Sequence, residues 1–175
     1  MTTQPTTTEP TQLPNPETRA GQEEMKRMGL IPFPVADDLT RPYWDAAKRH
    51  ELVIQQCTTC GEYRHPPRAT CLFCKSADAE WVKLSGKGTV FTFIIDHRNE
   101  VPGFDGNYVF AFINPVEAER NTVRITCNIL ECDPRDVYIG MPVEVMYKEI
   151  KPGIVLPEFR PAPEAKLRSK GQIPG

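Results

Sequence analysis

The sequence has little of what marks a membrane or nucleic-acid protein. Its 175 residues contain no apolar run of about 18 residues, the length that crosses a bilayer. The N-terminus has neither the basic nor the apolar region of a signal peptide. The net charge is only −2, with an isoelectric point near 6.0, which gives no general attraction to nucleic acid or membrane. We therefore expect a soluble, cytoplasmic protein.

Catalytic motifs are also missing. The sequence offers no Ser/His/Asp set, no H-x-x-x-H motif, no glycine-rich phosphate loop at a strand-helix junction and no evident carboxylate pair. His97 is the one candidate general base, but it stands between Asp96 and Arg98 at a predicted strand end, which is typical of a solvated residue. We expect no catalysis from this chain alone.

Six cysteines are present, and four of them form two C-x-x-C pairs separated by ten residues: Cys57, Cys60, Cys71 and Cys74. Four thiolates suit tetrahedral Zn(II) and leave no open position for a catalytic water. Disulfides and a redox C-x-x-C are the alternatives, but a redox pair needs only one motif beside a helix N-terminus. Gly61 follows the first pair, where a zinc knuckle needs backbone room. The spacing predicts a structural zinc site.

The remaining cysteines and the nearby histidines are not needed by that site. His50 and His65 flank the first pair, but four thiolates already complete the shell, so we expect surface histidines. Cys127 is interpreted as a buried apolar residue and Cys132 as a loop thiol. This use of cysteine fits a reducing compartment better than a disulfide scaffold.

The chain divides into four expected segments. Residues 1–36 are expected to form a disordered leader and an extended apolar strap: the first 16 are Thr/Pro-rich with too little apolar surface to fold alone, and the prolines at 32 and 34 favour extended backbone. Residues 37–78 form a helix plus the zinc ribbon, with Asp38 or Thr40 as the helix cap and an end near His50. The other segments are the barrel, 79–150, and an extended Pro-rich tail, 151–175.

The barrel is predicted from five short apolar stretches: Trp81–Leu84, Gly88–His97, Tyr108–Asn114, Thr122–Leu130 and Pro142–Ile150. The fourth alternates between apolar and mostly polar residues, as a strand with one buried face does. Gly86 and Gly88 flank Lys87, which suits a sharp bend or bulge. The predicted fold is mainly β, with an N-terminal helix and a four-cysteine ribbon followed by a five-stranded OB-fold barrel.

Three segments after the ribbon carry a family resemblance: LSGKGTV at 84–90, IGMPVEV at 139–145 and LPEFRP at 156–161. With the helix and the four cysteines, they resemble acyl-CoA-associated OB-fold proteins with a rubredoxin-like zinc ribbon, over about residues 38–163. The resemblance implies an accessory subunit whose partner is a thiolase-superfamily enzyme, either a ketoacyl-CoA thiolase or a retro-aldolase. That partner carries the catalytic residues. Some relatives are fused to a hydratase-like domain, which we do not find here, so we expect a separate polypeptide in a complex with two copies of each chain.

Candidate contacts with the ligand and the partner follow from this resemblance. Arg68, Lys87 and Arg98 are candidates for CoA phosphate contacts, because guanidinium and ammonium groups pair well with phosphate oxygens. Phe104, in the loop 99–106, is a candidate partner anchor. Phe159 and Arg160 are candidates in the tail. The alternative for each partner residue is packing against its own barrel, and for each cation an ordinary surface charge.

Two alternative functions are a nucleic-acid-binding protein and a stand-alone enzyme. A single-stranded nucleic-acid binder could stack bases on Phe91 and Phe93, but the acidic isoelectric point and the scarcity of Lys and Arg on the strands argue against it. A stand-alone thioesterase or acyltransferase lacks a nucleophile. The acyl group, and the choice between thiolysis and retro-aldol cleavage, depend on the residues of the partner.

Overall fold

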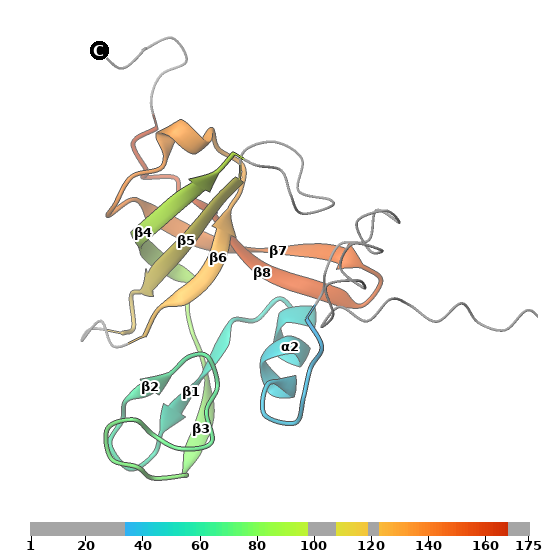
Figure 1. Ribbon diagram of the computed structural model, residues 1–175, viewed down its shortest axis with the longest axis vertical. Helices are drawn as coiled ribbons and strands as arrows, with labels where there is room; N and C mark the ends of the chain where they lie inside the picture. Colours follow the sequence, from blue (N-terminus) through green and yellow to red (C-terminus); the bar gives the residue numbers. More distant parts are fainter. Residues whose placement is uncertain (1–33, 98–107, 119–122, 168–175) are drawn as a thin grey trace, which may run out of the picture.

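The computed structural model describes residues 34–97, 108–118 and 123–167, and it is mainly β. Figure 1 shows a small three-stranded sheet below a closed barrel, with an α-helix beside the sheet, within this described part. The expected leader and most of the strap lie outside the described residues. The elements are α2 (Arg41–Lys48), β1 (Val53–Cys57), β2 (Tyr63–Arg64), β3 (Ala79–Lys83), β4 (Lys87–Asp96), β5 (Tyr108–Pro115), β6 (Ile125–Ile129), the 3-10 turn η1 (Pro134–Asp136), β7 (Pro142–Lys151) and β8 (Ile154–Pro161).

Helix α2 begins where the sequence predicts. Thr40 is the N-cap and Pro42 lies in the first turn, where its missing N–H costs no hydrogen bond. The Thr40 side chain does not cap the helix, because its hydroxyl donates to Asp37 Oδ1 at 2.6 Å. The helix ends at Lys48, just before His50, whose φ of 58° leaves the helical region. Within the described residues, no helix is long and apolar enough to cross a bilayer.

The small sheet belongs to the ribbon and has the order β2-β1-β3. Strand β3 runs antiparallel to β1, from Val53 opposite Lys83 to Cys57 opposite Ala79. The segment predicted as the first barrel strand, Trp81–Leu84, therefore lies largely in the ribbon, and that prediction was wrong. The physical reason is backbone hydrogen bonding. Strand β2 pairs with only two residues of β1, so the N–H and C=O groups on the other edge of β1 need a partner, and β3 supplies it along all five residues.

The barrel is closed by β4-β5-β6-β8-β7. Its fifth strand is β8, which the sequence analysis placed in the Pro-rich tail. Strand β8 pairs along β7 and touches β6 through one parallel pair, Ile129 opposite Phe159. Because its edge toward β6 makes so few ladder bonds, β8 accommodates Pro157 and Pro161. A five-stranded OB-fold barrel is confirmed, with a different set of five strands.

The glycines between ribbon and barrel allow the predicted close approach. Gly86 has a φ of +79°, and a Cβ there would collide with the Val145 side chain. At Gly88 a Cβ would lie 2.6 Å from the carbonyl oxygen of Asn114. The bulge itself falls at Phe91, where the β4-β5 register shifts. The chain therefore turns from one sheet into the other at these glycines.

A single apolar core joins the two parts. It contains Tyr43 from α2 and Ile54 from β1, together with barrel residues such as Val90 and Phe159. The predicted alternation in the fourth stretch is confirmed, because four of its side chains are buried: Val123, Ile125, Cys127 and Ile129. Helix, ribbon and barrel are thus packed as one body.

Candidate metal centre

The two C-x-x-C pairs form two knuckles of the same backbone design. In the first, Gly61 N–H donates to Cys57 O at 2.8 Å, and in the second, Lys75 N–H donates to Cys71 O at 3.1 Å. The residue after each second cysteine has a positive φ, 77° at Gly61 and 66° at Lys75. The first knuckle therefore has the positive φ that was predicted to favour glycine at position 61. In the second knuckle Lys75 adopts the same backbone conformation.

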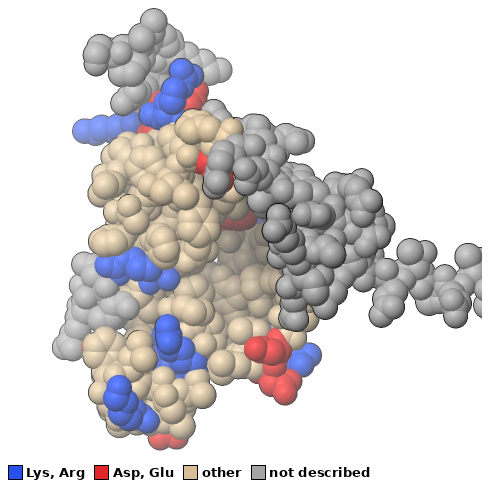
Figure 2. All heavy atoms as spheres, viewed as in Figure 1, with Lys and Arg blue, Asp and Glu red and all other residues tan. Residues whose placement is uncertain are grey.

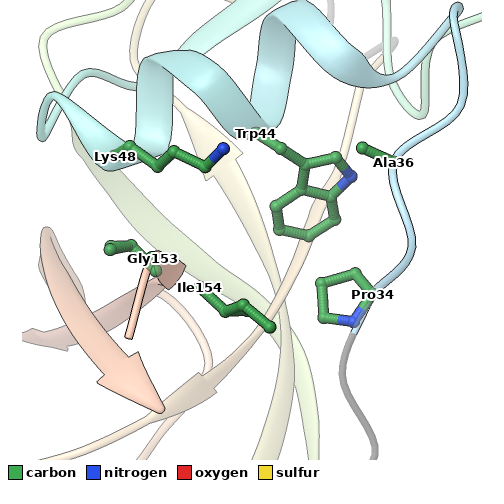
Figure 3. Close-up of a pocket in the computed structure, with 7 residues that line it drawn as sticks. Pro34, Ala36, Trp44, Lys48, Gly153 and Ile154 are labelled. Carbon is green, nitrogen blue, oxygen red and sulfur yellow. The ribbon is translucent and has the colours of Figure 1, made fainter. Parts of the chain in front are cut away.

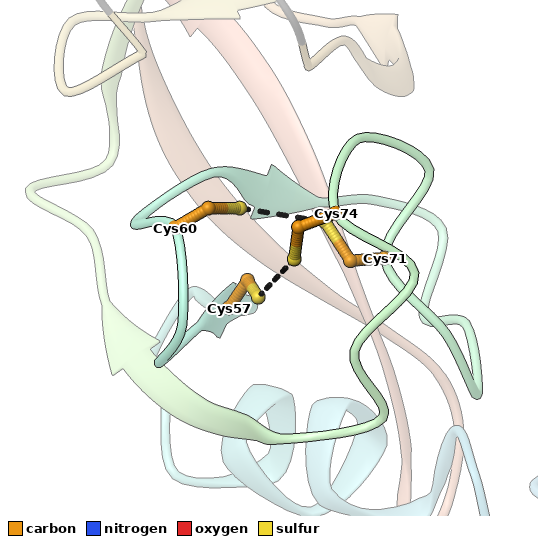
Figure 4. A group of neighbouring side chains, drawn as sticks. All are labelled: Cys57, Cys60, Cys71 and Cys74. Carbon is orange, nitrogen blue, oxygen red and sulfur yellow. Dashed lines mark hydrogen bonds between the residues drawn. The ribbon is translucent and has the colours of Figure 1, made fainter.

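The four cysteine sulfurs meet between the knuckles (Figure 4). All four Sγ atoms lie within 4.8 Å of one another. Two of these separations join the two knuckles: Cys57 to Cys74 at 3.5 Å and Cys60 to Cys71 at 3.6 Å. In a tetrahedron with Zn–S bonds of about 2.3 Å, sulfur atoms stand about 3.8 Å apart. All four cysteines are free thiols in this structure, so the donor set fits a tetrahedral cation rather than disulfides.

The electrostatics of the cluster favour a cation. Cys57 and Cys71 are buried, whereas Cys60 and Cys74 are exposed. Burial opposes ionisation of Cys57, but hydrogen bonds from backbone N–H groups and the Arg64 side chain lower its pKa to about 6. A backbone hydrogen bond at Glu62 lowers the pKa of Cys60, but burial and the hydrogen bonds with the other three sulfurs outweigh it and raise that pKa, because neighbouring thiolates repel one another. A bound divalent ion would relieve that repulsion.

The other cysteines and the histidines lie apart from the four sulfurs of this cluster. Cys127 is buried, as predicted, and burial raises its pKa; Cys132 is half-buried. The His50 ring stacks on Tyr147 with centroids 4.9 Å apart. His65 was expected at the surface, but it packs against Tyr43, and burial lowers its pKa to about 4. Both histidines therefore have packing partners.

The predicted ligand and partner residues are dispersed. Arg68, between the knuckles, and Lys87, at the start of β4, are exposed. Arg98 and Phe104 lie outside the described residues. Phe159 is 1% exposed in the barrel core, so its assignment as an exposed partner anchor was wrong and the alternative, packing on its own barrel, is what the structure shows. Burial follows from its place in β8, a strand that closes the barrel.

Arg160 is half-buried and engaged within the chain. Its Nε donates to Glu144 at 2.9 Å and its Nη1 to Glu131 at 3.2 Å. These bonds fasten β8 to β7 and to the turn after β6. A partner contact by Arg160 stays a prediction.

Two cavities border helix α2. The smaller, about 100 Å³, lies between α2 and β8 and is lined by Trp44, Lys48 and Ile154 among others (Figure 3). The larger, about 420 Å³, is an open groove that includes Arg41, Arg49 and Trp81. Both arginines already pair with acidic residues of this chain, Asp38 and Glu51. Neither cavity contains a cation predicted to bind CoA.

Sequence reasoning missed two buried charged residues. Arg64 beside the cysteines and Glu158 in the barrel wall are each 4% exposed. Arg64 had one weak signal, its position between the two knuckles. Glu158 had none, because a glutamate in a Pro-rich stretch is typical of a solvated tail.

Comparison with known proteins gives matches along most of the described chain. The ChsH2 rubredoxin-like zinc ribbon domain matches residues 44–80, and the ChsH2 C-terminal OB-fold domain matches residues 81–148. The chain is 36% identical over 141 residues to the "Probable enoyl-CoA hydratase alpha subunit" of Thermomonospora curvata, covering 81% of this chain but only 43% of that relative.

Two further relatives are covered almost completely. A "DUF35 domain-containing scaffold protein" of Methanocaldococcus jannaschii is 35% identical over 129 residues, with 69% of this chain and 85% of the relative covered. A solved chain described as "Ltp2-ChsH2(DUF35) aldolase" is 35% identical with a TM-score of 0.67, covering 73% of this chain and 98% of that one. The predicted resemblance is confirmed. With both of its domains matched in order and its fold shared, this chain belongs to the ChsH2 (DUF35) family of zinc-ribbon and OB-fold proteins.

Proposed function

We propose that this chain is a zinc-containing, non-catalytic accessory subunit of a thiolase-superfamily enzyme that acts on an acyl-CoA. The observation that carries the proposal is the match to the solved Ltp2-ChsH2(DUF35) aldolase, whose matched chain is covered over 98% of its length. The name of that relative places it in an aldolase assembly, and the scaffold name of the archaeal relative agrees with a supporting role.

The zinc ion would be held by Cys57, Cys60, Cys71 and Cys74. Four sulfur ligands close the coordination shell, so the metal supplies structure and not a reactive water. Binding of the ion would tie β1 to the turn after β2. Because the ribbon shares its apolar core with the barrel, the metal would stabilise the whole described body.

The supporting role agrees with where the titratable residues lie. His50 and His65 are engaged in packing with tyrosines, and Glu158 is held by Asn128. None of these contacts pairs a nucleophile with a base. The chain would therefore act by binding the enzyme and shaping or stabilising its acyl-CoA site.

The ligand and partner contacts are the finer part of the proposal. Arg68, Lys87 and Arg98 remain the candidate contacts for CoA phosphates, and Phe104 and Arg160 remain the candidate partner contacts. A thiolase-type homodimer would offer two symmetry-related sites, so we infer two copies of each chain.

The proposal is tested by affinity purification of the tagged full chain from its native cell extract, followed by mass spectrometry and metal analysis. We expect a thiolase-superfamily protein in near-equal amount, and one zinc per chain. The purified complex is then assayed with acyl-CoA substrates for thiolysis and for retro-aldol cleavage, with and without this chain. An enzyme that is fully active and fully stable without the chain would contradict the proposal.

A second candidate, single-stranded nucleic-acid binding, is favoured by one observation. Phe91 is 47% exposed, and the Arg124 guanidinium carbon lies 4.1 Å from its ring centroid. On the face shown in Figure 2, however, Lys and Arg groups stand apart from one another and form no stripe that could follow a phosphate backbone. Fluorescence anisotropy with labelled single-stranded oligonucleotides at low salt tests this candidate, for which Phe91→Ala should weaken binding.

A further inference from the structure

Strand β3 forms an edge of the ribbon sheet. The strand order is β2-β1-β3, so β1 covers one side of β3 and no strand of the described residues covers the other. The pairing of β3 with β1 runs along the whole strand in one register, from Ala79 to Lys83. A strand edge presents N–H and C=O groups to which another extended chain can bond. The outer side of β3 is therefore a candidate interaction surface.

The hydrogen bonds to β1 show which groups face the open side. Leu84 N–H donates to Leu52 O at 2.8 Å. In an antiparallel ladder bonded pairs alternate with non-bonded pairs, so the next residue of β3 that bonds to β1 is Val82. The N–H and C=O groups of Trp81 and Lys83 therefore point away from β1. Among the described residues, no backbone hydrogen bond uses them.

The pairing of β1 with β2 agrees with this alternation. Cys57 N–H donates to Glu62 O at 2.8 Å, so Cys57 turns its backbone toward β2. Its partner on the other side, Ala79, then also directs its N–H and C=O to the open edge. Three alternate residues of β3 thus offer backbone donors and acceptors to a further strand.

The usual protection of a strand edge is weak in β3. Proline, bulges and outward lysine side chains commonly prevent pairing with another chain. Strand β3 contains no proline, and its pairing with β1 has no register shift. Its one lysine is engaged elsewhere, because Lys83 Nζ pairs with Glu51 at 3.0 Å. The edge is open to an added strand.

A groove at Trp81 indicates which side chain such a strand carries. The groove, about 420 Å³, is lined by Trp81 and by one side of α2, including Arg41 and Arg49. Both arginine side chains are more than half exposed, so their ion pairs within this chain are weak and can be exchanged. Asp45 is the one acidic residue of the lining. Two guanidinium groups against one carboxylate favour an acidic side chain.

We propose that β3 is a docking edge: an extended, acidic segment of a protein partner joins it as a fourth strand of the ribbon sheet and places a carboxylate in the groove at Trp81. Backbone hydrogen bonds supply the affinity, and the groove selects the side chain. This inference rests on the proposed function, because the segment is taken to belong to the partner enzyme.

Proline at position 83 tests the edge while leaving the ladder to β1 intact. Because the Lys83 N–H faces the open side, Lys83→Pro removes one donor there and places a ring in the path of the added strand. Lys83→Ala is the matched control, since it loses the same side chain but keeps the N–H. We expect the full-length Lys83→Pro chain to bind the purified partner enzyme about tenfold more weakly than Lys83→Ala. Equal binding by the two variants would overturn the docking edge.

The groove is tested by the double variant Arg41→Gln, Arg49→Gln, with Lys166→Gln as the control at an exposed cation elsewhere. The double variant should bind the enzyme about threefold to tenfold more weakly at low salt and show a smaller salt dependence, whereas the control should match wild type. An unchanged affinity and salt dependence would overturn the acidic segment. If zinc content and circular dichroism show that Lys83→Pro does not fold, this double variant and the exchange measurement decide.

Hydrogen–deuterium exchange resolved to single amides shows what covers the edge. In the isolated full chain the amides of Trp81 and Lys83 should exchange fast and that of Val82 slowly. Adding the enzyme should slow the first two about tenfold or more. An enzyme that binds but leaves both amides unprotected overturns this inference and not the proposed function. A wild-type chain that captures no thiolase-superfamily enzyme overturns the proposed function.

The same measurement recognises two other occupants. Protection of Trp81 and Lys83 already present in the isolated chain would overturn the proposal. If dilution removes that protection, a second copy of the chain covers β3. If removal of residues 1–33 abolishes it, the N-terminal segment of the same chain does.

Discussion

Glu158 shows how one residue contributes to closure of the barrel. Its Oε2 accepts a hydrogen bond from Asn128 N at 2.6 Å, and its Oε1 accepts one from Asn128 Nδ2 at 3.0 Å. These bonds join β8 to β6, where the strand ladder has a single pair. Burial nevertheless raises the pKa of Glu158, more than Asn128 and the nearby Lys148 lower it. Among its neighbours, Tyr43 and Cys127 have pKa values that its charge raises further.

This pKa shift predicts a pH dependence of stability. Because the folded pKa of Glu158 is above the ordinary value of 4.5, the folded state holds its proton more tightly than the unfolded state. The stabilisation from this group is complete below that ordinary pKa and is lost as pH rises through the folded pKa. We expect the difference in unfolding free energy between wild type and Glu158→Gln to fall as pH rises above 4.5.

Urea denaturation from acidic to mildly alkaline pH checks this expectation, with the exposed Glu80→Gln as the control. The control should follow wild type at every pH. A difference between wild type and Glu158→Gln that rises with pH, or stays constant, would show that Glu158 does not have a raised pKa.

Cys60 gives a second test at the scale of the residue. Removing one thiolate leaves three ligands, so Cys60→Ser should lose the zinc and with it the folding free energy that metal binding supplies. We expect much less than one zinc per chain by elemental analysis, and loss of activity in the partner complex. Cys132→Ser, outside the cluster, should keep the metal. A zinc-free variant that supports the partner normally would contradict the structural role.

At the scale of the element, the turn from β3 into β4 depends on two glycines, whereas the β7-β8 turn depends on one. Gly86 and Gly153 have nearly the same positive φ, +79° and +78°. A Cβ at Gly86 would collide with Val145, but a Cβ at Gly153 would meet no atom within 4 Å. The pair therefore separates the cost of backbone strain from the cost of crowding.

We expect Gly153→Ala to lower the unfolding free energy by about 1 kcal/mol through strain alone. Gly86→Ala should lower it by roughly 2–4 kcal/mol, because overpacking adds to the strain. Thermal and urea unfolding of both variants measure the difference. Equal losses in the two variants would mean that the Val145 side chain moves aside without cost.

At the scale of the whole molecule, β8 holds helix, ribbon and barrel together. Its Phe159 belongs to the common core, and Arg160 pairs with residues of two other segments. Helix α2 also packs against this strand. The two matched family domains cover residues 44–80 and 81–148. Strand β8 follows both of them in the chain, yet helix, ribbon and barrel all pack against residues of this strand.

A truncation tests this dependence. Ending the chain after Gly153 removes β8 and should abolish cooperative unfolding, because β6 and β7 lose their common neighbour. Ending it after Leu167 keeps every described element and should leave the melting temperature nearly unchanged. Circular dichroism melts compare the two truncated chains. A cooperative melt in the shorter chain would show that the barrel closes without β8.

The sequence by itself determined the features that depend on short-range pattern. The cysteine spacing identified the cluster of four sulfurs, because a knuckle is a local turn that carries its own two sulfurs. Short apolar stretches located β4, β5, β6 and β7. Alternation marked β6 in addition, because one buried face imposes a period of two. The start of α2 also followed from local rules for caps and proline.

Only the tertiary structure decided which strands became neighbours. It placed β3 in the ribbon, brought β8 into the barrel, and buried both Phe159 and Arg64, the latter against the backbone carbonyls of residues 76–78. The reason is that strand pairing and charge burial are settled between segments far apart in the chain, wherever free backbone edges and unbalanced charges find partners. Neither alternation nor motif spacing contains that information.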